Sequence, residues 1–228
     1  LLLSSAASDV YKRQVEDAQE LANNLGIKHS VIPIGDIYES FYKELSEEFK
    51  GQDPDITEEN LQSRCRGVIL MALSNKSGRL VLTTGNKSET AVGYSTLYGD
   101  TAGGFGVLKD VPKILVYQLS KYRNTLSEVI PERIIERPPS AELAPNQQDS
   151  DSLPDYDVLD KIIELYVEQD KSKTEIVSEG FDESIVKRVI RLIDISEYKR
   201  RQAPLGVKIT SRGFGKDRRY PITNRYSQ

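Results

Sequence analysis

A short polar turn at residues 84–89 gathers side chains that could bind an anionic substrate. The apolar run of residues 80–83 stops at Thr84 and Gly85, and the carboxylate of Glu89 follows. In an α/β protein a strand delivers ligand-binding groups to its carboxyl end, where the next helix presents free backbone N–H groups. The turn supplies small polar groups, a cation and an oxygen ligand for Mg²⁺: Thr84, Asn86, Lys87, Ser88 and Glu89. A solvated turn broken by glycine is the alternative that the same residues allow.

Three further segments accompany this turn in a fixed order. The four together are ENLQSRCRG (59–67), LTTGNKSE (82–89), GDTAGG (99–104) and DVPK (110–113). In this order and spacing they resemble NAD⁺ synthetase, the family of ATP-dependent ligases that amidate deamido-NAD⁺ to NAD⁺. The resemblance runs from about Val15 to the C-terminus and is closest to the long, glutamine-dependent branch.

The resemblance implies a reaction in two steps and the partners that it needs. The nicotinate carboxylate of deamido-NAD⁺ attacks the α-phosphate of ATP, and ammonia then displaces AMP from the adenylated carboxylate. Ammonia would come from glutamine through a glutaminase domain of the same parent chain. Mg²⁺ would accompany ATP, and we expect a cytoplasmic homodimer or larger homo-oligomer without nucleic acid or membrane partners.

Matching the motifs residue by residue implies the following sites. The deamido-NAD⁺ contacts would be Asn60, Arg64, Glu89 and Lys199, with Arg200 and Arg201 as neighbouring cations that compete for the last role. The ATP contacts would be Thr84, Lys113 and Ser140. Glu89 would also ligate Mg²⁺, and Asp100 is a candidate partner for ammonium or Mg²⁺ in a reaction with no assigned acid–base residue.

The helix that carries Asn60 and Arg64 has a structural alternative. The two residues are four apart and therefore share one helix face. That face could be a solvated polar surface opposite an apolar side around Leu61, Val68 and Ala72. The motif context favours a binding face.

Two features depart from the family pattern. No Ser-Gly-Gly-x-Asp-Ser loop, which would hold the pyrophosphate of ATP, occurs in the 228 residues. Leu97 stands where the short, ammonia-using branch carries a lysine. Residues 1–14 read as a non-native, adaptor-like segment that we expect to be disordered. We expect residues 15–228 to be a ligase domain without its first strand and pyrophosphate loop, and inactive alone.

Composition sets broad limits on the class of protein. The single cysteine, Cys65, excludes an internal disulfide and fits a reducing compartment. No apolar run approaches the ~20 residues of a membrane span. Residues 173–193 have a helix–turn–helix pattern, which a DNA-binding module could share. The main face of the second helix is apolar, however, and this disfavours DNA binding. A GMP synthetase-type amidotransferase of the same fold is the closer alternative.

Hydrophobic periodicity predicts alternating helices and strands, which indicate a doubly wound parallel sheet. A polar, proline-rich loop at 137–154 separates this part from a helical C-terminal part. From residue 187 onward, twelve Lys or Arg face three acids, which predicts an anionic partner or an acidic neighbouring surface. One expected helix is opened by Asp36 or Ser40 and reaches residue 49, and a long one is capped by Thr57 or Asp55 and reaches about residue 75. The other expected helices cover 15–25, 111–126, 156–168, 173–178 and 182–201, and the expected strands cover 27–34 and 80–83.

Overall fold

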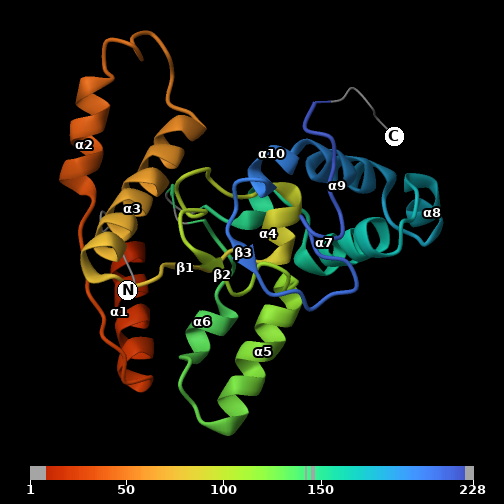
Figure 1. Cartoon of the computed structure of the whole chain (residues 1–228), viewed down its shortest axis with the longest axis horizontal. Coiled ribbons are helices and arrows are strands. Elements are labelled where there is room, and N and C mark those ends of the chain that lie inside the picture. Colours follow the sequence, from red (N-terminus) through yellow and green to blue (C-terminus); the bar gives the residue numbers. More distant parts are fainter. Residues whose placement is uncertain (1–8, 142, 145–146, 224–228) are drawn as a thin grey trace.

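A computed structural model describes residues 9–141, 143–144 and 147–223. Within these ranges helices dominate, and three two-residue strands lie among them; Figure 1 shows their arrangement. The elements are α1 (Asp9–Asn24), α2 (Gly35–Glu44), α3 (Ile56–Ser77), β1 (Leu82–Thr83), α4 (Lys87–Val92), β2 (Phe105–Gly106), α5 (Lys113–Leu126), α6 (Glu132–Glu136), η1 (Asp149–Asp151), α7 (Tyr156–Ile163), η2 (Glu164–Glu168), α8 (Lys173–Ser178), α9 (Glu183–Ile195), α10 (Glu197–Arg200) and β3 (Leu205–Gly206).

The strands form one parallel sheet in the order β1-β2-β3. Leu82 pairs with Phe105, which in turn pairs with Leu205 from the far end of the chain. Gly206 allows the last pair to form, because a Cβ there would lie 2.4 Å from the Gly106 carbonyl oxygen. A parallel sheet with flanking helices confirms the predicted fold class.

The hydrophobic core lies where α4, α7, η2 and α9 pack together. Apolar residues recur at helical spacing along α9, and its inner face is buried. Because that face is buried in the core, α9 cannot use it to contact DNA as a recognition helix would. The fully buried members include Leu159, Ile162, Val186, Val189 and Ile193.

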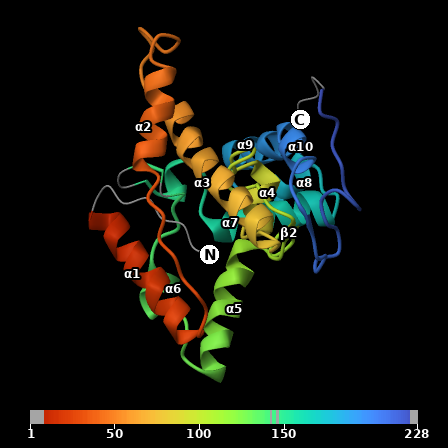
Figure 2. The same cartoon turned by 60° about the vertical axis from the view of Figure 1, so that its left-hand side comes forward.

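Helix α3 is capped by Asp55, one of the two candidate caps that the sequence offered. The Asp55 carboxylate accepts a hydrogen bond from Thr57 N at 2.7 Å, and Glu58 completes a capping box. With α2, this helix stands to one side of the sheet (Figures 1 and 2). Its buried face differs from the predicted one, because it carries small residues that fit closely beneath a loop. Buried are Ser63, Cys65 and Gly67, whereas Val68 and Ala72 are exposed.

Two predictions near the N-terminus need correction. Residues 27–34 form no strand, since no described segment pairs with them and an isolated apolar run has no ladder of hydrogen bonds. Helix α1 begins at Asp9, ahead of Val15, because Lys, Arg and Gln at 12–14 are good helix formers. Residues 1–8 lie outside the described residues, and the non-native origin of 1–14 stays a prediction.

The C-terminal helices match their predicted ranges closely. Helix α8 spans the predicted residues, α7 continues into the π-helical turn η2, and the last expected helix divides into α9 and α10 at Ser196. None of the helices in the described ranges combines the length and the apolar character that crossing a membrane requires.

Candidate active site

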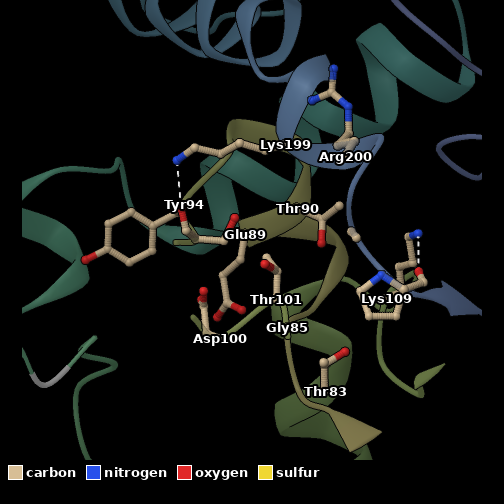
Figure 3. A pocket seen from close by; sticks show the side chains of 13 residues that line it. Thr83, Gly85, Glu89, Thr90, Tyr94, Asp100, Thr101, Lys109, Lys199 and Arg200 are labelled. Carbon is tan, nitrogen blue, oxygen red and sulfur yellow. Dashed lines mark hydrogen bonds between the residues drawn. The ribbon is translucent and has the colours of Figure 1, made fainter. Parts of the chain in front are cut away.

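A hollow opens beside the carboxyl end of β1 (Figure 3). The end of β1, the start of α4, the loop after α4 and the end of α10 surround it. Open α/β sheets bind ligands at the carboxyl ends of their strands, so its position fits a substrate site. Its lining residues are Thr83, Gly85, Glu89, Thr90, Tyr94, Ser95, Asp100, Thr101, Lys109, Lys199, Arg200, Ala203 and Pro204.

The polar turn after β1 is organised by a capping box at the start of α4. Asn86 Oδ1 accepts a hydrogen bond from Glu89 N at 3.0 Å, and Glu89 Oε2 accepts one from Asn86 N at 3.2 Å. Thr84 follows the strand directly, as predicted, but it is exposed and does not line the hollow. The neighbouring Thr83 lines it instead.

Lys87 and Ser88 do not offer their side chains to the hollow, contrary to the expectation from the turn. Each successive helical residue is rotated by about 100°, so Lys87 faces the opposite side of α4 from Glu89, and Ser88 is turned about 100° away from it. Lys87 is 1% exposed within a network of polar groups, and Ser88 Oγ donates to the Asp160 carboxylate. Both residues therefore hold the helix in place.

Glu89 and Lys113 form an ion pair at the edge of the hollow. Lys113 Nζ lies 3.1 Å from Glu89 Oε1, and the ammonium stands 5.3 Å from the centroid of the Tyr156 ring. Burial lowers the pKa of Lys113, but the neighbouring Glu89 carboxylate outweighs it and leaves the pKa raised. Lys113, itself one of the predicted ATP contacts, is thus a fixed cation at the N-terminus of α5.

The carboxylates of Asp100 and Glu89 lie beside each other (Figure 3). Asp100 Oδ1 accepts a hydrogen bond from Thr96 N at 2.6 Å. The pKa of Asp100 is raised to about 6, mainly because surrounding atoms displace water from its carboxylate, with Glu89 adding repulsion. The residue keeps part of its surface exposed, so this site is open to solvent on one side.

Two adjacent carboxylates favour a cation between them. Mg²⁺ commonly takes one or two protein carboxylates and completes its shell with substrate phosphates and water. Across the described ranges, no three His, Cys, Asp or Glu residues gather as a metal cluster. Glu89 and Asp100 therefore fit Mg²⁺ only together with phosphate oxygens, and they fit ammonium equally well in charge.

Asn60 and Arg64 hold the loop that carries Asp100. Asn60 Oδ1 accepts a hydrogen bond from Thr96 Oγ1 at 2.7 Å, and Arg64 Nε donates to Leu97 O at 3.2 Å. Neither residue lines the hollow itself. The predicted helix face thus meets the site through the loop at 96–100.

Lys199 is the cation of the C-terminal trio that faces the hollow. Its ammonium donates to the carbonyl oxygens of Gly93 and Ser95, each at 2.7 Å, and burial lowers its pKa. Arg200 is held in the core by carbonyl groups and by Glu197, although its residue borders the hollow. Arg201 is half exposed and pairs with Glu197 on the other side.

The structure thus brings together three of the predicted residues, Glu89, Asp100 and Lys199, and places Lys113 against the first. Ser140 is half buried and lies outside the lining set. Sequence reasoning missed Tyr94 and Lys109, which line the hollow. Neither residue belongs to one of the four family-like segments. Lys109 directly precedes the DVPK segment, and this position is the one signal that could have indicated it as a site residue.

A parallel sheet with a charged hollow at its strand ends defines an α/β protein of the nucleotide-binding type. The model of the NAD synthase family matches residues 2–203, and the chain belongs to that family.

Individual relatives agree with this membership. The chain is 58% identical over 212 residues to a glutamine-dependent NAD(+) synthetase from Acinetobacter baylyi, a match that covers 92% of this chain and 39% of the relative. It also resembles the glutamine-dependent NAD⁺ synthetase from Acinetobacter baumannii solved with ADP (TM-score 0.57, 50% identity, 96% of this chain, 39% of that one). NMN synthetase from Francisella tularensis gives a TM-score of 0.72 at 26% identity, over 87% of this chain and 74% of that one. The chain therefore spans about two fifths of the length of the glutamine-dependent relatives.

Proposed function

We propose that this chain forms part of an enzyme that amidates deamido-NAD⁺ to NAD⁺ with ATP and with ammonia from glutamine. The observation that carries the proposal is the grouping of Glu89, Asp100 and Lys199 around one hollow at the strand ends. Two carboxylates and a cation suit a reaction between a carboxylate, a polyphosphate and ammonia, because each developing charge meets a fixed opposite charge.

The side chains divide between the two substrates. Lys113 and the backbone at Thr84 face the ATP phosphates, and Ser140 approaches the nucleotide from the loop at 137–154. Lys199 contacts deamido-NAD⁺, while Asn60 and Arg64 bind it through the helix that supports the loop at 96–100. The ADP bound by the Acinetobacter baumannii relative supports a nucleotide site in this fold.

Glu89 and Asp100 handle the cations of the reaction. Mg²⁺ on ATP would be held by Glu89 together with phosphate oxygens, and it would neutralise charge as pyrophosphate leaves. Asp100, which has a pKa of about 6, would accept ammonium beside the nicotinate carboxylate and take a proton from it. Ammonia would be supplied by a glutaminase domain in the remaining part of the parent chain.

We further propose a cytoplasmic homodimer in which α3 contributes to the interface. Its outer face leaves Ile56, Val68 and Met71 substantially exposed, and Ile56 and Val68 are each about two-thirds exposed. Burying these exposed apolar side chains against a second copy would stabilise both subunits. Light scattering at micromolar concentration tests this, and a strictly monomeric protein would contradict it.

The amidation itself is tested in a chimera in which this chain replaces the matching 39% of the Acinetobacter baylyi relative. The chimera is incubated with ATP, Mg²⁺, glutamine and deamido-NAD⁺, and NAD⁺ is measured by chromatography. We expect NAD⁺ and AMP in equal amounts. Amination of xanthosine monophosphate in place of amidation of deamido-NAD⁺ would favour the GMP synthetase-type alternative and overturn the proposal.

A further inference from the structure

The chain continues past its last helix as an extended segment, residues 205–220, here called the C-terminal strap. The family model ends at residue 203, just before the strap begins. Figure 1 shows it in dark blue, from β3 toward the C-terminus. Ala203 and Pro204, which lead into it, line the hollow, and Lys109 donates to the Pro204 carbonyl oxygen.

Two carboxylates from the body of the protein hold successive strap residues. Asp110 accepts hydrogen bonds from Ile209 N at 2.8 Å and Thr210 N at 2.9 Å. Glu168 accepts one from Ser211 N at 3.2 Å. Burial raises the pKa of Asp110, but these hydrogen bonds outweigh it and leave the pKa lowered, so this carboxylate stays charged.

Lys87 joins both carboxylates to the strap. Its ammonium lies 2.8 Å from Glu168 Oε1 and 3.2 Å from Asp110 Oδ1. It also donates to Thr210 Oγ1 at 2.5 Å and to the Arg212 carbonyl oxygen at 3.0 Å. A lysine that is 1% exposed is stable only with such partners, because an unpaired buried charge is costly.

The outer part of the strap is held by charge pairs within the chain. Lys208 pairs with Asp217 at 2.8 Å, and Asp170 binds both Arg212 and Arg218. The basic end of the sequence therefore has acidic neighbours in its own chain. Arg212 and Arg218 hold the strap against Asp170 of the body, whereas the Lys208–Asp217 pair lies within the strap itself.

The strap also reaches the helix that carries Lys199. Phe214 and Tyr220 stack against the guanidinium of Arg200, at 4.7 and 5.3 Å from their ring centroids. Arg200 in turn donates to Ala91 O in α4 at 2.6 Å. The strap thus contacts α4 and α10, the two helices that bring Glu89 and Lys199 to the hollow.

We propose that Lys87 is a positioning residue and that it acts by latching the C-terminal strap, which fixes the first turn of α4 and with it Glu89. Lys87 and Glu89 lie on opposite sides of the same helical turn. Holding Lys87 on one side therefore fixes the position of the Glu89 carboxylate on the other. The inference rests on the proposed function only where it treats the hollow as a substrate site. The coupling between the strap and the first turn of α4 does not depend on that function.

The experiment compares Thr210→Val with Thr210→Ser. Valine has nearly the shape of threonine but removes the hydroxyl that accepts from Lys87 and donates to Asp110, whereas serine keeps it. Hydrogen exchange followed by mass spectrometry reports on peptides covering 85–92 and 205–213. We expect Thr210→Val to speed exchange in both by ~10-fold, as the loss of a buried hydrogen bond to a charged group allows. Thr210→Ser should resemble the parent.

A second pair of variants guards against misfolding and tests Lys87 directly. Lys87→Met removes the latch, and Lys161→Met makes the same chemical change at an exposed lysine on α7. ADP affinity is measured by calorimetry, and we expect Lys87→Met and Thr210→Val to weaken it by at least ~5-fold, since loss of positioning lowers affinity.

The outcomes separate the latch from the proposed function. Faster exchange in the strap with an unchanged turn at 85–92 would overturn the proposal, because the strap would then be merely structural. If Thr210→Val speeds exchange in both segments but the parent chain binds no ADP, the latch is supported and the nucleotide site is contradicted. Unchanged exchange in both segments in all variants would also overturn the latch.

Discussion

The ammonium of Lys113 lies 3.1 Å from Oε1 of Glu89, and the two side chains are only 18% and 20% exposed. The other oxygen of the same carboxylate closes the capping box of α4. One side chain therefore joins the start of α4 to the start of α5. Its charge is fixed in place before any substrate arrives, which is the condition under which a charge stabilises a transition state most effectively.

Replacing Glu89 by glutamine isolates the effect of that charge. Glutamine also completes a capping box, so the fold should change little. We expect turnover of the chimera to fall by ~10²-fold or more, as removal of a charge-stabilising group typically does. The rate of NAD⁺ formation measures this, with Glu47→Gln as the control at a glutamate whose side chain is 86% exposed. An unimpaired Glu89→Gln chimera would move the catalytic centre elsewhere.

Gly67 is expected to be intolerant of even one methyl group. A Cβ there would lie 2.6 Å from the Tyr98 carbonyl oxygen, in the loop that leads to Asp100. Gly67→Ala should lower the free energy of unfolding by about 1–3 kcal/mol through overpacking. Denaturant unfolding measures it. Gly35→Ala is the matched control, because nothing lies within 4 Å of its added carbon, and an equal loss in both variants would refute close packing as the cause.

The sequence predicted those elements well whose formation depends on neighbouring residues in the chain. The Asp55 cap and the periodicity of α8 and α9 are local, and their helices fell close to the predicted residues. Residues 27–34 have a strand-like composition, but a strand also needs a hydrogen-bonding neighbour, which local sequence does not reveal.

The same distinction holds for the candidate site. The resemblance to the family predicted Glu89, Asp100 and Lys199 as site residues, and the structure places all three around one hollow. It did not reveal that Lys87 and Ser88 face away, because α4 is packed on both sides and its sequence carries polar residues on each. Thr210, which completes the Lys87 network, is distant in sequence and belongs to no motif.

Asp100 should give the folded chain a characteristic pH dependence. Folding raises its pKa from 3.8 to about 6, so between these values the folded chain binds more protons than the unfolded chain. The contribution of Asp100 to stability is therefore lost as pH rises through this window. Melting temperatures of the parent and of Asp100→Asn, taken from about pH 4 to about pH 6.5, measure the difference. We expect the variant to gain stability relative to the parent as pH rises, and parallel curves would contradict the raised pKa.

Lys199 should affect one substrate and not the other. Its ammonium lies at the side of the hollow next to Gly93 and Ser95, where Asp100 and Arg64 are the charged groups that act on it. We expect Lys199→Met in the chimera to raise KM for deamido-NAD⁺ by ~10-fold, the loss of one charge-assisted contact, and to leave KM for ATP unchanged. Steady-state kinetics separates the two constants. Arg201→Met is the control at a neighbouring cation that points to Glu197, and an equal effect in both variants would assign the role to general positive charge.

The 228-residue chain on its own is expected to bind substrates without converting them. Adenylation requires the pyrophosphate of ATP to be held in line with the attacking carboxylate, and such positioning supplies much of the rate. No Ser-Gly-Gly-x-Asp-Ser sequence occurs in the chain to do this, whereas Glu89, Lys113 and Lys199 are in place. We therefore expect calorimetry to detect weak binding of ADP and deamido-NAD⁺. The chain given ATP, Mg²⁺, ammonium and deamido-NAD⁺ should form no NAD⁺ under conditions in which the chimera does. Robust turnover by the chain alone would show that its own residues hold the pyrophosphate and that the catalytic centre extends beyond the hollow described above.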